Sequence, residues 1–261
     1  MKKTLLSVTG YDPSGGAGAL LDVRVFESLN FQGMAILTAL TVQNTRKVQS
    51  VLPFPPRTLM AQYASLSRDV AFAGIKTGML GSIKNIRPLA QILAKHPDLP
   101  RVIDPVLRAS SGIPLLEEDA IPSLLKALSG HATLLTPNMR EASLMAGIPV
   151  ASPQDMREAS RILFERTEIP CLVKGGHLKK GALNVLYDGR RTIIYGHEKL
   201  RKNVHGTGCF LSAAILAYLA RGFSLEGACG RAADLTHEAI MKAIKPGKGR
   251  SLFTFKLRKK T

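Results

Sequence analysis

The glycine-rich segment Gly206-Thr207-Gly208-Cys209 is the part of the sequence whose residue types most clearly suggest chemistry. It runs into an apolar stretch that predicts a helix over residues 208–220. Without side chains at the two glycines, backbone N–H groups can converge on an anion, and the helix N-terminus adds partial positive charge. Phosphoryl transfer depends on positioning and charge neutralisation, so the segment suits it. The alternative is that the glycines only permit a tight turn into a buried helix.

A second glycine-rich stretch, residues 10–18, follows the first apolar run and leads into a helix that carries Asp22. It is not a dinucleotide-binding fingerprint, because Leu21 stands where the third glycine belongs, and no Walker sequence ending in Gly-Lys-Ser/Thr occurs. The glycines of this stretch, beginning with Gly10, have no side chains and so let a small ligand approach the backbone closely. Asp22 could accept a hydrogen bond from a substrate hydroxyl or amine, or it could be an ordinary surface carboxylate.

Three further apolar runs end in polar or charged side chains. Asp104 follows residues 101–103, Asn138 and Glu141 follow residues 133–136, and Lys174 ends residues 171–174. Open α/β sheets bind ligands at the carboxyl ends of their strands. An acidic group there can hold hydrated Mg²⁺ beside phosphates, and a lysine can contact phosphate as a point charge. Glu141 could instead serve only as a favourable charge at a helix N-terminus.

The composition is that of an ordinary globular protein with a strong excess of positive charge. The 261 residues are 45% hydrophobic and 21% charged, and 36 Lys and Arg against 19 Asp and Glu give a formal charge of +17. The charge is scattered and no nucleic-acid-binding module is present, so we expect no nucleic-acid partner. The three cysteines, Cys171, Cys209 and Cys229, form no C-x-x-C pair, and no apolar run is long enough to span a bilayer. We expect a cytoplasmic protein without a membrane partner.

Short apolar runs alternate with longer helical patterns along the chain. The runs predict strands at residues 4–9, 34–42, 71–77, 101–104, 133–136, 171–174, 183–187 and 192–195. The patterns predict helices at residues 17–29, 58–68, 83–95, 118–128, 140–146, 153–166, 208–220 and 225–243. This alternation is typical of an α/β fold with a mainly parallel sheet covered by helices on both faces, with a hairpin formed by the last two strands. We predict a single domain, residues 1–261, with a basic tail from about residue 245.

Seven motifs occur in an order that carries a family resemblance. They are Gly10-x-Asp12-x-Ser14-Gly15-Gly16-Ala17-Gly18-x-x-x-Asp22, Thr38-Ala39-Leu40-Thr41-Val42-Gln43-Asn44-Thr45, Lys76-Thr77-Gly78-Met79-Leu80, Val102-Ile103-Asp104-Pro105-Val106, Leu135-Thr136-Pro137-Asn138-x-x-Glu141-Ala142, Val173-Lys174-Gly175-Gly176-His177 and His205-Gly206-Thr207-Gly208-Cys209. Together they resemble the hydroxymethylpyrimidine/phosphomethylpyrimidine kinase family of thiamine synthesis, within the ribokinase-like superfamily. The resemblance extends from the first predicted strand to about Ala243.

The resemblance implies a ribokinase-like three-layer α/β/α sandwich and a homodimer. It also implies two successive phosphorylations that depend on ATP and Mg²⁺, first of 4-amino-5-hydroxymethyl-2-methylpyrimidine and then of its monophosphate. In that family pattern Gln43 would read the pyrimidine edge and Asp22 would lie near the polar groups of the ring. Met79 and Val106 would form apolar walls of the substrate site, and Gly10 would belong to its glycine-rich loop.

The family pattern also assigns a nucleotide side to the site. Metal and phosphates would lie among Asp104, Asn138 and Glu141, with Lys174 on the ATP phosphates. Gly206, Thr207, Gly208 and Cys209 would form the anion hole. Many ribokinase-like sugar kinases carry an aspartate general base where this chain has Cys209. A thiol at a helix N-terminus has a lowered pKa in principle, so Cys209 could accept the substrate proton, although ATP phosphates would oppose its ionisation.

Two other functions are compatible with these residues. A pyridoxine or pyridoxal kinase of the same superfamily would phosphorylate another flat ring with a hydroxymethyl group, and Gln43 favours the aminopyrimidine because its amide offers both a donor and an acceptor. A non-catalytic sensor of nucleotide or thiamine precursor is the third interpretation. The complete set of Asp104, Glu141, Lys174 and Cys209 argues against the sensor, which would need no phosphoryl-transfer machinery.

Overall fold

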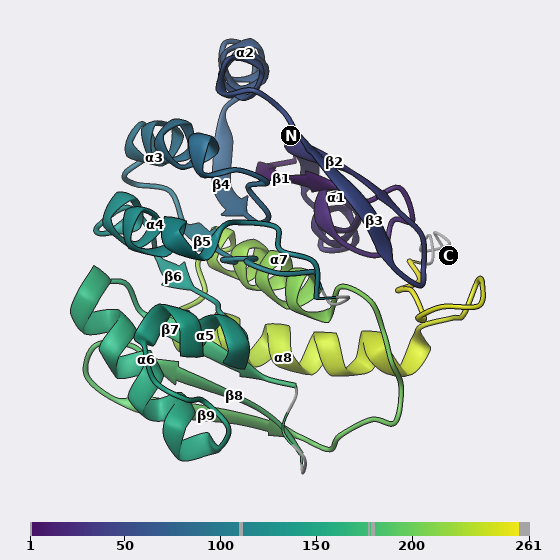
Figure 1. Cartoon of the computed structure of the whole chain (residues 1–261), viewed down its shortest axis with the longest axis vertical. Coiled ribbons are helices and arrows are strands. Elements are labelled where there is room, and N and C mark those ends of the chain that lie inside the picture. Colours follow the sequence, from purple (N-terminus) through teal and green to yellow (C-terminus); the bar gives the residue numbers. More distant parts are fainter. Residues whose placement is uncertain (1, 110–111, 177, 179–180, 256–261) are drawn as a thin grey trace.

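One mixed β-sheet forms the centre of the computed structural model, which describes residues 2–109, 112–176, 178 and 181–255 (Figure 1). Its nine strands have the order β3-β2-β1-β4-β5-β6-β7-β8-β9. Pairing is parallel from β2 to β7, whereas β3 is antiparallel to β2, and β8 is antiparallel to both β7 and β9. The strands are β1 (Thr4–Tyr11), β2 (Gln32–Gln43), β3 (Val48–Pro53), β4 (Phe72–Thr77), β5 (Arg101–Ile103), β6 (Leu134–Leu135), β7 (Cys171–Gly175), β8 (Ala182–Tyr187) and β9 (Thr192–His197).

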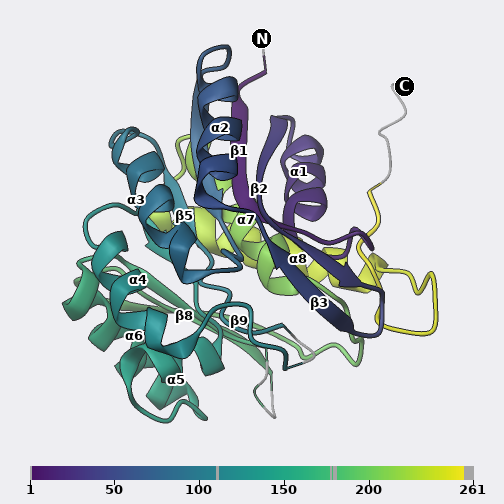
Figure 2. The ribbon, with the colours of Figure 1, turned by 45° about the horizontal axis from the view of Figure 1, so that its top comes forward.

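Helices cover both faces of this sheet (Figure 2). One face carries α1 (Gly18–Ser28), α7 (Thr207–Ala220) and α8 (Leu225–Lys242). The other carries α2 (Pro56–Ser67), α3 (Ile86–Ala94), α4 (Ile121–Leu128), α5 (Met139–Ala146) and α6 (Pro153–Thr167). The short 3-10 turns Ile83–Asn85 and Glu118–Ala120 lead into α3 and α4. The predicted three-layer α/β/α sandwich is confirmed.

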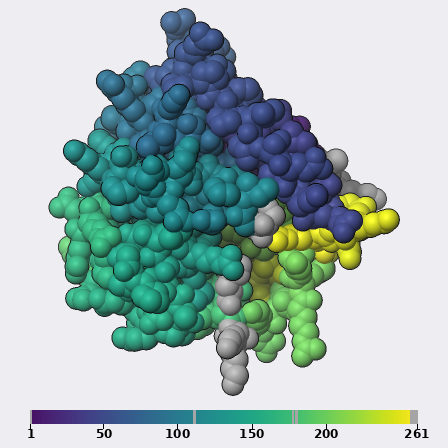
Figure 3. Space-filling model, in the orientation of Figure 1, coloured from purple at the N-terminus to yellow at the C-terminus, as the bar shows by residue number. Residues whose placement is uncertain are grey.

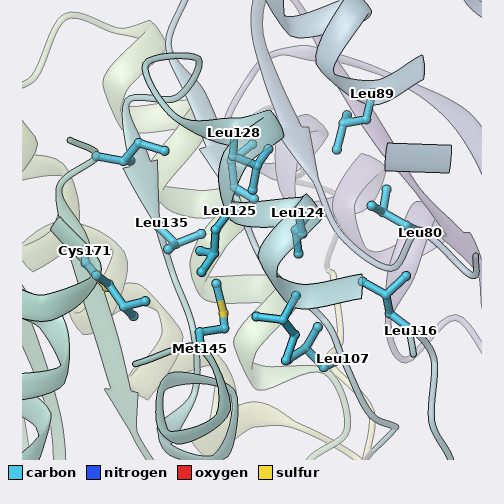
Figure 4. Close-up of a cluster of buried hydrophobic side chains, with 14 of the residues drawn as sticks. Leu80, Leu89, Leu107, Leu116, Leu124, Leu125, Leu128, Leu135, Met145 and Cys171 are labelled. Atoms are coloured by element: carbon cyan, nitrogen blue, oxygen red, sulfur yellow. The ribbon is translucent and has the colours of Figure 1, made fainter. Parts of the chain in front are cut away.

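Alternate residues of the strands build two separate cores. Leu5 packs into the core under α1, α7 and α8, whereas its neighbour Leu6 packs into the core on the opposite face. This alternation follows from the two-residue repeat of a strand, and burial of each such leucine contributes about 1.5–3 kcal/mol. Figure 4 shows part of the second core, where Leu124, Leu125 and Leu128 of α4 lie among leucines of the sheet and loops.

The structure agrees with the predicted elements except at one edge of the sheet. Each predicted strand and helix is present with ends that differ by a few residues. The predicted hairpin is formed by β8 and β9. The strand β3 was not predicted, because it is an edge strand whose residues are exposed or only partly buried and therefore lack an apolar alternation.

Candidate active site

The carboxyl ends of the parallel strands open onto a cavity of about 610 Å³. Figure 3 shows one face of the molecule, on which the β2–β3 region and the C-terminal segment (yellow) lie side by side. Most of the predicted site residues line this cavity, although they come from distant parts of the chain. They are Gly10, Gln43, Met79, Asp104, Val106, Asn138, Glu141, Lys174, Gly206, Thr207, Gly208 and Cys209.

The N-terminus of α7 lies against the glycine-rich loop of residues 10–18. Gly206 is the N-cap of α7 and has φ +76°, a conformation that favours glycine. A Cβ at Gly206 would lie 1.9 Å from the carbonyl oxygen of Gly16, so a side chain there would push the two loops apart. The first N–H groups of a helix have no partner within it and remain available to an anion. The geometry therefore supports the predicted anion-binding character of residues 206–209.

Lys174 and Asp104 form an ion pair beside this helix end. Lys174 Nζ lies 2.6 Å from Asp104 Oδ1, and Ser212 Oγ donates to Asp104 Oδ2 at 3.2 Å. A Cβ at Gly208 would lie only 3.0 Å from Lys174 Nζ, which shows how closely the ammonium group approaches α7. Burial lowers the pKa of Lys174, but the carboxylates of Asp104 and Glu141 outweigh this effect and raise it. Lys174 is therefore a permanent cation in the cavity wall.

Asn138 and Glu141 form a capping box at the start of α5. Asn138 Oδ1 accepts from the Glu141 backbone N–H at 3.0 Å, and Glu141 Oε2 accepts from the Asn138 N–H at 2.7 Å. Burial raises the pKa of Glu141 to about 7, with Lys174 lowering it and Asp104 raising it further. Glu141 thus has the helix-terminal role that was one of its two interpretations. Its position in the cavity wall also leaves it available to a ligand.

The two acidic residues predicted to bind metal, Asp104 and Glu141, face the same cavity. The carboxylate of Asp104 contributes to the raised pKa of Glu141, so the two groups lie close enough for their charges to interact. In the part of the chain that the structure describes, no cluster of three or more His, Cys, Asp and Glu could hold a metal by itself. Mg²⁺ usually takes only one or two carboxylates and completes its shell with water and phosphates. The pair therefore fits Mg²⁺ that arrives with a nucleotide.

Asp22 occupies a different place from the one predicted. Its side chain is fully buried and does not line the cavity. Lys76 Nζ donates to its two carboxylate oxygens at 2.9 and 2.7 Å, and Ser7 Oγ donates to it at 2.6 Å. The prediction of direct substrate contact is wrong for this arrangement, because the side chain is fully buried and does not reach the cavity. Sequence reasoning gave Lys76 no role, although a lysine within a strand that is otherwise buried is a signal for such a pair.

Cys209 is a neutral thiol. Burial raises its pKa to about 11, Lys76 lowers it, Asp104 and Asp22 raise it, and a hydrogen bond from the Gly18 backbone lowers it. The expectation of a pKa lowered by the helix N-terminus is therefore wrong. Desolvation of the charged thiolate outweighs the favourable helix dipole and the nearby ammonium group.

Asp12 and His205 were quoted in the motifs but were given no role from the sequence. Both line the cavity, and Asp12 Oδ2 lies 3.0 Å from Nε2 of His205. Asp12 belongs to the glycine-rich stretch of residues 10–18 and His205 directly precedes the glycine-rich segment 206–209, so their pairing across 193 positions joins the two segments. His177, another residue of the motifs, and residues 256–261 of the basic tail lie outside the described residues. Within the described ranges, no helix has the length and apolar character required to cross a membrane.

Comparison with known proteins finds relatives along nearly the whole chain. The family described as phosphomethylpyrimidine kinase matches residues 12–253. The hydroxymethylpyrimidine/phosphomethylpyrimidine kinase of Aquifex aeolicus is 36% identical over 252 residues, which make up 96% of this chain and 99% of that protein. The chain belongs to the phosphomethylpyrimidine kinase family. This membership confirms the resemblance carried by the ordered motifs and shows that the chain is a phosphotransferase.

Solved structures with the same fold include kinases for two different rings. This kinase is similar to the phosphomethylpyrimidine kinase of Clostridium difficile 630, with TM-score 0.80 and 31% identity over 92% of this chain and 100% of that one. It is also similar to the pyridoxal kinase of Staphylococcus aureus in complex with AMP-PCP and pyridoxal, with TM-score 0.88 and 29% identity over 97% of this chain and 93% of that one. These similarities confirm the ribokinase-like fold.

Proposed function

We propose that this kinase transfers the terminal phosphoryl group of ATP to 4-amino-5-hydroxymethyl-2-methylpyrimidine and then to the resulting monophosphate. Family membership and the 36% identical Aquifex aeolicus relative, named for both activities, support the proposal. The observation that carries it is the meeting, in one cavity, of the α7 N-terminus, Lys174, two carboxylates and Gln43.

The phosphates of ATP would lie at the N-terminus of α7. Backbone N–H groups of Thr207, Gly208 and Cys209 are the donors that an oxyanion or phosphate needs there, and they require no rearrangement when charge develops. Lys174, beside Gly208, adds a point charge. The Staphylococcus aureus structural relative binds an ATP analogue, AMP-PCP, which supports the same use of the fold here. Asp104, Glu141 and Asn138 would hold Mg²⁺ near these phosphates, and the ion would neutralise charge on the transferred group.

The pyrimidine would lie next to the terminal phosphate, on the side of the cavity near the end of β2. Gln43 would read the ring edge with its amide, and Met79 and Val106 would form apolar walls. Met79 Cε occupies the space where a Cβ at Gly10 would lie, at 2.2 Å, so Gly10 makes room for this wall. The four residues Gly10, Gln43, Met79 and Val106 line the same cavity as residues 206–209.

Transfer requires the substrate hydroxyl to attack the terminal phosphorus while the bond to ADP breaks, and the hydroxyl proton passes to an oxygen of the transferred phosphoryl group or to water. The transition state of phosphoryl transfer is loose, so the demand for a strong base is small. Cys209 would lie beside the attacking hydroxyl as a neutral thiol, consistent with its raised pKa. Its role is to orient the hydroxyl by hydrogen bonding, and full base catalysis is not required.

Pyridoxal or pyridoxine is the second candidate substrate. The Staphylococcus aureus pyridoxal kinase, whose structure contains pyridoxal, covers 97% of this chain at 29% identity. A kinase for both rings would need a slot that accepts two hydrogen-bonding patterns. The relative turnover of the two rings decides between these substrates.

Mass spectrometry of the products tests the function directly. The kinase is incubated with ATP, Mg²⁺ and hydroxymethylpyrimidine, and in parallel with pyridoxal. We expect two sequential mass gains of one phosphoryl unit each on the pyrimidine. A single gain on pyridoxal alone would favour the alternative, and binding of either ring without ATP consumption would indicate the sensor. The homodimer and the cytoplasmic location remain predictions of the sequence.

A further inference from the structure

The carboxylate of Asp12 has no role in the function proposed above, although it is nearly surrounded by donors at the substrate end of the cavity. Its Oδ1 accepts from the backbone N–H and Oγ of Ser14 at 2.8 and 2.7 Å. Its Oδ2 meets Nε2 of His205 at 3.0 Å. Gln43 lies beside it, because Thr41 Oγ1 near the end of β2 donates to the Tyr11 carbonyl at 2.9 Å and both Asp12 and Gln43 line the cavity, and hydrogen bonding from Gln43 lowers the pKa of Asp12. Asp12 is only 3% exposed, so this set of partners replaces water almost completely.

The protonation state of Asp12 determines which end of the Gln43 amide faces it. Burial raises the pKa of Asp12, but the hydrogen bonds from His205, Gln43 and Ser14 outweigh burial and lower the pKa below its usual value. An ionised carboxylate only accepts hydrogen bonds. Gln43 must therefore turn its NH₂ group toward Asp12. Because the amide is planar, its oxygen Oε1 then points away from the carboxylate.

The position of Asp12 does not depend on Gln43. Ser14 holds it within its own loop, and His205 holds it from the segment before α7. His205 is itself fixed, because its backbone N–H donates to the carbonyl of Ser251 at 2.9 Å. Its ring also fills the space that a Cβ at Gly16 would need, 2.4 Å from Cδ2. Asp12 is thus a fixed hydrogen-bond acceptor that can determine the orientation of the Gln43 amide.

We propose that Asp12, held by Ser14 and His205, is a positioning residue that fixes the orientation of the Gln43 amide, so that a ring entering the cavity meets the acceptor Oε1. The inference rests on the proposed function and adds a determinant of substrate choice to it. A 4-amino ring offers a donor to Oε1. A ring with oxygen at that position sets one acceptor against another, which leaves a buried polar group unpaired and is strongly disfavoured.

A matched pair of rings tests this selection. The probes are 4-amino-5-hydroxymethyl-2-methylpyrimidine and its 4-oxo analogue, which differ only at the edge that Gln43 would read. For the wild type we expect kcat/KM to favour the amino ring by at least about 100-fold, as expected for a site built to hydrogen-bond one pattern. In Asp12→Asn the new amide both donates and accepts hydrogen bonds, so the Gln43 amide can face it with either its oxygen or its nitrogen. The preference then falls to about tenfold or less, mainly through KM.

A second variant distinguishes positioning from a general structural role. In Asp12→Asn/Gln43→Glu, the asparagine donates to one glutamate oxygen and the other oxygen faces the ligand as an acceptor. We therefore expect the double variant to regain the preference for the amino ring. Asp188→Asn is the matched control, because Asp188 also accepts from backbone N–H groups, those of Arg190 and Arg191, but lies in the β8–β9 turn and does not line the cavity. It should keep the wild-type preference.

Several outcomes would overturn the inference without touching the proposed function. One is an Asp12→Asn variant that phosphorylates the amino ring and keeps the wild-type preference. Another is an equal loss with both rings that the double variant does not restore, which would make Asp12 a structural residue only. Binding of the two rings, measured by calorimetry without ATP, gives the same ratio independently of turnover. If the wild type binds the amino ring preferentially but phosphorylates neither ring, the proposed function fails and the inference stands.

Discussion

Two buried lysine–aspartate pairs lie near the start of α7, but only one of them faces the cavity. In the sealed pair, Lys76 and Asp22, both side chains are 0% exposed. In the open pair, Lys174 and Asp104, the side chains are 10% and 2% exposed, and both residues line the cavity. The N···O distances are nearly equal, 2.7 and 2.6 Å. The chemistry of the two pairs is therefore the same, and their access to ligand differs.

This difference separates a structural charge pair from the pair that we propose to be functional. The sealed pair has no route to a ligand, and each charge depends on the other for compensation of its desolvation. The open pair faces the cavity, where, in the function that we propose, Lys174 would contact phosphate and Asp104 would contact Mg²⁺.

Removing the cation of the sealed pair should destabilise the whole fold. Lys76→Met leaves Asp22 buried without its cation, and breaking such a pair costs about 3–5 kcal/mol. Urea unfolding followed by circular dichroism measures the loss. Lys76→Met/Asp22→Leu removes both charges and should recover most of the stability. A single variant as stable as the wild type would show that Asp22 does not need Lys76.

Removing the cation of the open pair should affect catalysis more than stability. We expect Lys174→Ala to lower kcat/KM for ATP by about 10²–10³, the loss usual for one donor to a developing oxyanion. Asp104 keeps its hydrogen bond from Ser212 and can be reached by water through the cavity. Steady-state kinetics and urea unfolding on the same protein separate the two effects. A variant that unfolds like Lys76→Met but retains its activity would reverse the assignment of the two pairs.

Ionisation of Glu141 should make the open pair sensitive to pH. With a pKa of about 7, Glu141 is mostly protonated at pH 6 and mostly ionised at pH 8. The ionised form binds Mg²⁺, so apparent Mg²⁺ affinity should rise with pH, by about tenfold between pH 6 and 8. Mg²⁺ titrations of the rate across this range measure the effect. Glu141→Gln has no titrating group and should show a flat profile, whereas an unchanged slope in this variant would assign the ionisation to another residue.

Residues of both ion pairs affect the pKa of Cys209, since Lys76 lowers it while Asp104 and Asp22 raise it. Because the thiol is neutral, Cys209→Ser, which keeps a neutral hydrogen-bonding group, should lower kcat only by about fivefold or less. Cys209→Ala should lose more, because nothing then orients the hydroxyl. Kinetics of both variants between pH 7 and 9 provide the measurement. Wild-type turnover in Cys209→Ala would remove Cys209 from the reaction, and a loss of about 10²-fold or more in Cys209→Ser would indicate a thiolate base.

Much of the fold followed from local sequence patterns, and all the predicted site residues except Asp22 line the cavity. Apolar runs and helix signals gave each predicted strand and helix to within a few residues, and only the edge strand β3 was missed. Asp104, Asn138 and Lys174 could be placed at one edge of the sheet because parallel strands present their carboxyl ends together, whereas Gln43 was assigned through the family resemblance. Local patterns could not show which carboxylate would face the cavity, because Asp22 and Asp104 both follow or adjoin buried segments.

The sequence by itself determined the alternation of strands and helices, the two glycine-rich segments and, through the order of its motifs, the kinase family. These properties depend on residues close together in the chain or on their order. Only the tertiary structure decided that Lys76 seals Asp22, that Asp12 meets His205 across 193 positions and that Cys209 is held as a thiol. Ion pairing, desolvation and the shift of a pKa depend on distances between side chains in space, and distant segments acquire those distances only when the sheet and its two helical layers pack together.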